Sequence, residues 1–329
     1  MLLLWIIVFC ISLFILIKAA DYFTESAEKI GYLLKISPFI IGVTIISIGT
    51  SLPELATSII ATIQDQTQIV VANAIGSNIA NILLVIGLTA IMAGKLVVKR
   101  SLIDIDLPLL ATATALIIIV MWDKQIVLGE GIVCILGYIV YAAYTMKGQK
   151  EEKGKLEGIV PGQDIPVTRE KRHKSRKKRQ DQTFRLIFIL LFSVIFIYLG
   201  ADWTIKSIVE IATLIGIPSS LVVMSAMAIG TSLPELVVSI GAARKGKFEI
   251  ALGNVFGSNI FNILIVMGAP ALFKNLIIDE ATFSVGIPFL IGATVLYTFS
   301  GISKKIYNWE GMMYLLIYFL FLARLFNLI

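Results

Sequence analysis

Charge, histidine and cysteine are all scarce in this chain of 329 residues. Only 15% of the residues are charged, and there are one histidine and two cysteines. Because soluble domains carry about 25% charged residues, the composition excludes an ordinary soluble enzyme and a disordered chain. Cys10 and Cys134 both lie in apolar runs, so they form neither a zinc site nor a disulfide framework.

Apolar residues are abundant instead. They make up 57% of the chain, and the mean hydropathy is +0.90. A helix that crosses a bilayer needs roughly 20 apolar residues, and ten such runs occur. The expected spans are residues 2–20, 37–64, 68–94, 105–121, 126–146, 184–202, 217–243, 248–273, 282–299 and 308–327. The first run has no basic segment before it, which favours an uncleaved helix over a signal peptide. The sequence therefore predicts an all-α integral membrane protein with ten transmembrane helices.

The net charge of +6 comes from one segment, residues 147–183, which holds twelve basic and six acidic residues. A local charge of this kind does not indicate nucleic-acid binding. We interpret the segment as a solvated basic linker, with anionic lipid at this loop as the alternative. Lysine and arginine are also frequent in every second loop. The positive-inside rule then predicts a multi-pass protein of the cell (inner) membrane with both termini outside and the linker cytoplasmic.

The sequence matches itself at an offset of 181 residues without a gap. The matched stretches are 48–55 on 229–236, Asn73 on Asn254, 76–79 on 257–260 and 81–83 on 262–264, with Asp21 falling on Asp202. This predicts two five-helix repeats, residues 1–146 and 184–329, joined by the linker. Since five is an odd number, the second repeat runs inverted in the membrane. Inverted repeats with interrupted helices are typical of secondary transporters with a site at the midplane.

Glu54 and Glu235 lie in the middle of apolar runs, where an ionised carboxylate costs at least a few kcal/mol. A lysine or arginine partner is the usual compensation, but neither run contains one. The positive partner is therefore a bound cation or protons. Pro53 and Pro234 precede the glutamates and remove a helical hydrogen bond, which exposes backbone oxygens at the same depth.

Hydroxyl and amide side chains surround these two positions in the sequence. The set is Thr50, Ser51, Thr231, Ser232, Ser77, Ser258, Asn81 and Asn262. Individually, such residues most often join helices within the membrane. Together with two carboxylates they form a site of oxygen donors only, which selects hard cations and suits Ca²⁺ better than Mg²⁺.

Gly-Thr-Ser-Leu-Pro-Glu at 49–54 and 230–235, each followed by Gly-Ser-Asn at 76–78 and 257–259, resembles the paired repeats of the sodium/calcium exchanger family. The resemblance implies that Glu54 and Glu235 bind Ca²⁺ and Na⁺ and that the hydroxyl residues line the sodium sites. It also implies that the backbone carbonyls of Ser47 and Ala228 contribute. Several family members have aspartate where this chain has Asn262, a departure that argues against potassium dependence.

We therefore expect a Ca²⁺ antiporter with Na⁺ as the counter-ion, acting as a monomer and without a cofactor. Exchange of Ca²⁺ for H⁺ is the alternative within transport, and a cation channel is the alternative of another class. No nucleophile–base set or phosphate-binding loop indicates an enzyme. Asp21 and Asp202 are interpreted as solvated helix ends, with a role at a gate as the alternative.

Overall fold

The computed structural model describes residues 1–33, 47–97, 107–156, 169–246 and 248–329. The first repeat contains α1 (Leu2–Leu33), α3 (Ser47–Thr50), α4 (Leu52–Ile63), α5 (Thr67–Ile79), η2 (Ala80–Val85), α6 (Ile86–Ala93), β1 (Lys95–Val97), α7 (Leu107–Val120), η4 (Met121–Asp123), β2 (Gln125–Ile126) and α8 (Leu128–Leu156). Parts of two expected spans, residues 37–46 and 105–106, lie outside the described residues.

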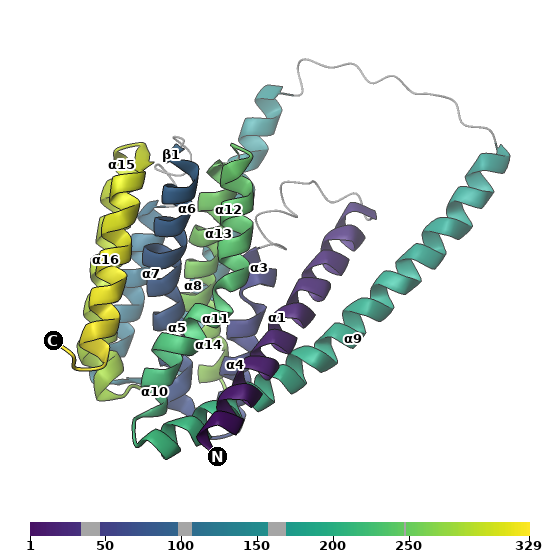
Figure 1. Cartoon of the computed structure of the whole chain (residues 1–329). Coiled ribbons are helices and arrows are strands. Elements are labelled where there is room, and N and C mark those ends of the chain that lie inside the picture. Colours follow the sequence, from purple (N-terminus) through teal and green to yellow (C-terminus); the bar gives the residue numbers. More distant parts are fainter. Residues whose placement is uncertain (34–46, 98–106, 157–168, 247) are drawn as a thin grey trace.

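The second repeat contains α9 (Arg169–Ile215), α10 (Ser219–Val222), η5 (Val223–Met227), α11 (Ala228–Thr231), α12 (Leu233–Arg244), α13 (Phe248–Phe261), η6 (Asn262–Val266), α14 (Gly268–Ala271), β3 (Leu276–Ile277), η7 (Thr282–Gly286), α15 (Ile287–Ile302), β4 (Lys305–Tyr307) and α16 (Asn308–Leu325). The helices form a bundle with both termini toward the same end, while α1 and α9 run obliquely along one side (Figure 1).

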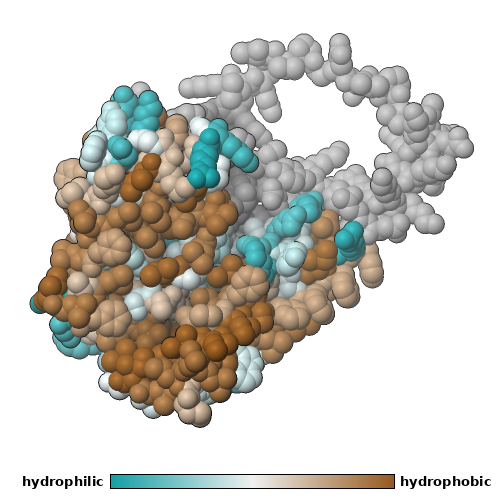
Figure 2. Space-filling model, viewed as in Figure 1, coloured by the Kyte–Doolittle hydropathy of each residue, from teal (hydrophilic) through white to brown (hydrophobic). Residues whose placement is uncertain are grey.

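Seven helices in the described part are long and apolar enough to cross a membrane, and two shorter apolar helices accompany them. This agrees with a multi-pass protein and is consistent with the ten spans expected. Apolar side chains cover most of the visible flank of the bundle, and hydrophilic ones gather at its upper end (Figure 2). An apolar flank of this kind is what contact with lipid requires.

The centre of the bundle consists of two equivalent segments. The span formed by α5, η2 and α6 is 94% buried, and the span formed by α13, η6 and α14 is 83% buried, whereas those of α1 and α9 are each 28% buried. Each central span contains a π-helical turn that begins at or beside an equivalent asparagine, Asn81 in η2 and Asn262 in η6. Such turns occur often at functional sites.

The expected interruptions of two helices are confirmed. The helix breaks at Ser51 between α3 and α4, and at Ser232 between α11 and α12, with a proline within the first two positions of the new helix in both cases. Proline starts a helix well because it needs no donor there. The glutamates consequently lie in the first turns of α4 and α12.

Two short sheets join the repeats, and they are equivalent under the 181-residue offset. β1 pairs antiparallel with β4, and β2 pairs antiparallel with β3. Each sheet therefore takes one strand from each repeat and closes one end of the bundle. We call these ends the β1–β4 end, uppermost in Figure 1, and the β2–β3 end.

The first and sixth spans are longer than expected. Residues 21–33 and 203–215 continue α1 and α9, so Asp21 and Lys29 lie within α1, beyond the end of the expected span. Ion pairs between Lys18 and Asp21 and between Glu25 and Lys29 explain the continuation, since side chains three and four residues apart meet on a helix surface. Parts of the linker, 147–156 and 169–183, are also helical.

α6 and α16 cross where two glycines meet. A Cβ atom added to Gly311 would lie 2.6 Å from the carbonyl oxygen of Gly87, which cannot move without shifting α6. We expect Gly311→Ala to destabilise the protein by about 1–3 kcal/mol, the usual cost of overpacking. Gly292→Ala on α15, where no atom lies within 4 Å, is the matched control. Melting temperatures in detergent should fall for the first variant only, and equal values would contradict this packing.

Candidate cation site

The two glutamates are fully buried at the middle of the bundle. Glu54 and Glu235 each have 0% of their surface exposed. Both stand in the first turn of a helix, where free backbone N–H groups and the helix dipole favour a negative charge. Ser51, at the break directly before α4, bonds to the Glu235 carboxylate, so the two glutamate-bearing turns face a common region.

The two carboxylates differ in their hydrogen bonds. Oε1 of Glu235 accepts a bond from the Ser258 hydroxyl at 3.1 Å and from the Ser51 hydroxyl at 3.3 Å. Its other oxygen, and both oxygens of Glu54, accept none from the described residues. Neither glutamate forms an ion pair with a described lysine or arginine. Three buried carboxylate oxygens therefore have no partner within hydrogen-bond distance among the described residues, although the Thr231 and Ser77 hydroxyls lie beside Glu54.

Hydroxyl groups bridge the two repeats around the glutamates. Oγ1 of Thr50 lies 3.3 Å from Oγ of Ser258, and Oγ of Ser77 lies 3.4 Å from Oγ1 of Thr231. These two contacts are equivalent under the offset of 181 residues. Each repeat thus supplies the same donors to a shared centre, and the repeat axis passes between them.

Other buried polar atoms near the glutamates are also without a hydrogen-bond partner among the described residues. They are Oγ of Ser232, the side-chain amides of Asn81, Asn259 and Asn262, and Oδ1 of Asn78. An unsatisfied buried polar group costs about 1–3 kcal/mol, and a charged one costs more. So many unsatisfied polar atoms are costly inside an apolar bundle, but a cation bound among the oxygen atoms would give those oxygens a partner.

The contacts given above join Thr50, Ser51, Ser77, Thr231 and Ser258 around the two glutamates, whereas Ser232, Asn81, Asn262, Ser47 and Ala228 are placed here only by their elements. Glu54, Thr50 and Ser51 lie at the first helix break, and Glu235, Thr231 and Ser232 lie at the second. Ser77 and Asn81 follow one another on α5 and η2, as Ser258 and Asn262 do on α13 and η6. Ser47 and Ala228 begin the short helices α3 and α11.

Sequence reasoning missed one pair of positioning residues, Asn73 and Asn254. The amide of Asn73 donates to the backbone oxygen of Glu54 at 3.0 Å and to Oγ of Ser58 at 3.0 Å. Asn254 makes the equivalent bonds to Glu235 and Ser239 at 3.5 and 3.4 Å. Each asparagine fastens a glutamate-bearing helix to the central span. The signal was present, because both asparagines matched in the repeat.

The donor set defines the chemistry of the site. No group of three or more histidine, cysteine, aspartate or glutamate residues occurs in the part of the chain that the structure describes. Carboxylate, hydroxyl and amide oxygens remain, which are ligands for hard cations.

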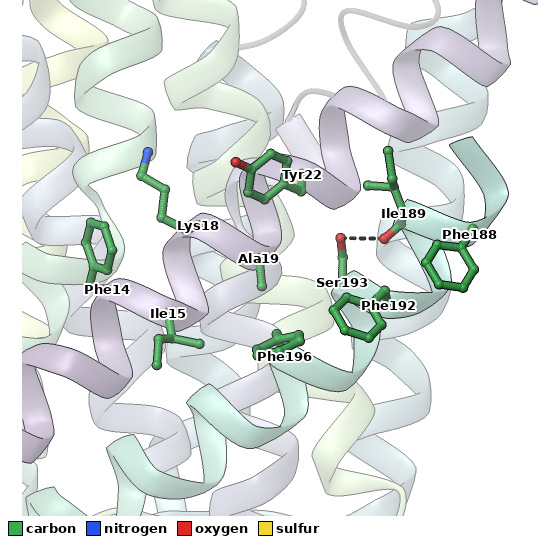
Figure 3. Close-up of a pocket in the computed structure, with 10 residues that line it drawn as sticks. All are labelled: Phe14, Ile15, Lys18, Ala19, Tyr22, Phe188, Ile189, Phe192, Ser193 and Phe196. Carbon is green, nitrogen blue, oxygen red and sulfur yellow. Dashed lines mark hydrogen bonds between the residues drawn. The ribbon is translucent and has the colours of Figure 1, made fainter. Parts of the chain in front are cut away.

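A groove of about 400 Å³ between α1 and α9 is separate from this site and is lined mainly by phenylalanine and aliphatic side chains (Figure 3).

The fold and the site together define a membrane transporter built of two repeats around a cation site. A model of the sodium/calcium exchanger protein family matches residues 4–147 and 185–327. The chain is 32% identical to the sodium/calcium exchanger MaX1 of Methanosarcina acetivorans over 97% of this chain and 98% of that protein. It is 34% identical to the putative antiporter CaxA of Alkalimonas amylolytica over 82% and 81% of the two chains.

Solved structures agree with the sequence comparisons. The sodium–calcium exchanger NCX_Mj, soaked with 100 mM Na⁺ and 10 mM Sr²⁺, superposes with a TM-score of 0.65 at 28% identity, covering 98% of this chain and 99% of that one. This chain belongs to the sodium/calcium exchanger family. It is accordingly a cation/calcium exchanger and not an enzyme, and its ions are transported, not held as cofactors.

The unpaired carboxylates lead to a binding prediction. Glu54→Gln and Glu235→Gln keep the shape of each side chain but remove one of the two negative charges, so each should weaken Ca²⁺ binding at least about tenfold, or 1.4 kcal/mol. Asp65→Asn is the matched control, because Asp65 is exposed and pairs with Lys274 at the β2–β3 end. Calorimetric titration of the purified proteins measures the effect. Unchanged binding in either glutamine variant would contradict the site.

Proposed function

We propose that this protein exchanges Ca²⁺ for Na⁺ across the membrane, binding the ions in turn between Glu54 and Glu235. The observation that carries the proposal is the pair of buried carboxylates with three unpartnered oxygens and no described cationic side chain beside them. Two carboxylates balance one Ca²⁺, and the surrounding Thr50, Thr231 and serine hydroxyls add neutral oxygens suited to Na⁺.

Exchange, as opposed to leak, follows from the same charge balance. When both carboxylates are ionised and no cation is bound, two negative charges remain in a low-dielectric region, at a cost of several kcal/mol. A conformational change that moves the site from one aqueous side to the other is therefore favoured only with ions bound. This supports alternating access, in which each half-cycle carries one kind of ion.

The orientation is also part of the proposal. Lys95 and Lys305 lie on paired strands at the β1–β4 end, where Lys304 is adjacent to β4. The β2–β3 end instead carries Lys124 and Lys274 bound to acidic partners. These β1–β4 lysines form no ion pair with a described residue, and their positive charge supports a cytoplasmic location for this end in the cell membrane, with both chain termini outside.

The decisive experiment measures ⁴⁵Ca²⁺ uptake into proteoliposomes. Vesicles loaded with Na⁺ should accumulate Ca²⁺ when placed in Na⁺-free medium, whereas vesicles with only a pH gradient should not. Glu54→Gln and Glu235→Gln should abolish uptake while retaining the elution profile of the folded protein. Uptake driven by the pH gradient alone would replace Na⁺ with H⁺ as the counter-ion, and uptake without accumulation would indicate a channel.

Asn262 provides a second test, because its buried amide has no described partner. Asn262→Asp adds an ionisable group on η6 while keeping the size of the side chain. We expect it to change which monovalent ion drives uptake more than it changes Ca²⁺ affinity. Asn308→Asp, at the start of α16 and far along the chain from the site, serves as the control. An unchanged dependence on Na⁺ and K⁺ would remove Asn262 from the monovalent site.

A further inference from the structure

The packing between α1 and α9 obeys the repeat symmetry. Besides the groove of Figure 3, a second groove lies farther along the same two helices. All eight positions that line the second groove are repeat equivalents of positions that line the first. The second groove is lined by Val8, Ile11, Ser12, Ile15, Phe196, Leu199, Gly200 and Trp203. The two helices thus form a symmetric pair, which we call the α1–α9 pair.

The packing of this pair against the remaining helices does not obey the symmetry. At the β2–β3 end, α9 packs along α4, but among the described residues α1 has no comparable packing along α12, its equivalent. In Figure 1, α1 and α9 lean away from the other helices toward the upper, β1–β4 end. The asymmetry therefore lies between the α1–α9 pair and the other described helices, which the pair contacts closely at the β2–β3 end and diverges from toward the β1–β4 end.

One hydrogen bond shows the asymmetry at single residues. Nε2 of Gln64, at the end of α4, donates to Oδ1 of Asp202 on α9 at 2.7 Å. The repeat equivalents are Lys245, at the end of α12, and Asp21 on α1. Among the described residues Asp21 pairs with Lys18 of its own helix only, and its side chain is 47% exposed. Asp202 likewise pairs with Lys206 of its own helix, but it accepts the Gln64 bond as well and is 18% exposed. Lys245 is exposed and forms no ion pair with a described residue.

The motif glycines show the same displacement. A side chain on Gly49 would collide with Thr24 of α1, and the symmetric contact of Gly230 would be with Ile205 of α9. In the structure Gly230 instead lies against Leu13 of α1. Both glycines therefore contact α1, at Thr24 and at Leu13, and neither contact has its repeat equivalent on α9. The α1–α9 pair is thus displaced from the position that would be symmetric with respect to the two motifs.

We propose that Lys245 and Asp21 form an inner lock, a contact that closes the β1–β4 end in the opposite state and replaces the Gln64–Asp202 bond. Two inverted repeats make that state accessible, because exchanging the roles of the repeats converts the present packing into its equivalent at the other end. This inference rests on the proposed alternating access and assigns residues to one of its states.

The inner lock differs chemically from the contact seen now. Gln64 is neutral and donates one amide bond to Asp202, which keeps its ion pair with Lys206. Lys245 would instead bring a second full positive charge to Asp21, beside that of Lys18. An exposed ion pair is weakened by salt much more than a neutral amide bond is. Closure of the β1–β4 end should therefore depend on ionic strength, and closure of the β2–β3 end should depend on it little.

Crosslinking tests the lock in the full-length protein in proteoliposomes. Cys10 and Cys134 are first replaced by alanine, and Asp21→Cys is combined with Lys245→Cys. A short bifunctional maleimide should join the pair and stop exchange. Gln64→Cys with Asp202→Cys is the positive control, and Asp21→Cys with Lys305→Cys, at the same end, should not crosslink. Crosslinking of the Gln64–Asp202 pair alone would overturn the proposal.

A charge exchange tests the electrostatic contact itself. Lys245→Asp and Asp21→Lys should each slow exchange about two- to fivefold, the range expected for an exposed ion pair, and the double variant should restore the rate. Lys305→Asp should leave the rate unchanged. Slowing without rescue would overturn the lock. Failure of the lock can be distinguished from failure of the proposed Na⁺–Ca²⁺ exchange. If only the exchange proposal is wrong, the cysteine pairs still crosslink as predicted, but the unmodified protein moves no Ca²⁺ against Na⁺.

Discussion

The cost of holding two carboxylates inside an apolar bundle is the constraint on which this structure depends. Glu54 and Glu235 are buried, repel one another and are not neutralised by a described cationic side chain. The fold offsets part of the cost by breaking two helices directly before them, so that each carboxylate meets the positive end of a new helix. In the proposed function, bound cations offset the rest of this cost. The free energy of the protein then depends on whether ions are bound.

The repeat explains how one short motif builds a complete site. Each half supplies a broken helix and a central span, but the hydroxyl bridges run between halves, from Thr50 to Ser258 and from Ser77 to Thr231. Neither half alone surrounds a cation with oxygens. The two sheets reinforce the arrangement because each joins a strand of one repeat to a strand of the other. The site therefore lies between halves that are fastened at both ends.

Sequence reasoning found the features that carry a strong local signal. A glutamate in an apolar run and a proline before it are visible in the sequence, and the buried glutamates and the breaks at Ser51 and Ser232 agree with them. The extension of α1 was missed, since Asp21 is interpreted from the sequence as a solvated helix end, although its ion pair with Lys18 stabilises a continuing helix. The strands span two or three residues, too few for a period-two pattern, and the role of Asn73 depends on contacts between helices.

The symmetric site and the asymmetric packing around it have different physical origins. The oxygens around Glu54 and Glu235 must stay nearly equivalent, because a cation held by both repeats is bound best when both contribute. The α1–α9 pair cannot pack equally well at both ends of the bundle at once, since α9 along α4 and α1 along α12 require opposite displacements of the same pair. The proposed alternating access therefore assigns the α1–α9 pair two arrangements, one packed on α4 and the other on α12. Under the proposed alternating access, Gln64 and Lys245, which are repeat equivalents but not chemical equivalents, would make the two arrangements unequal in energy.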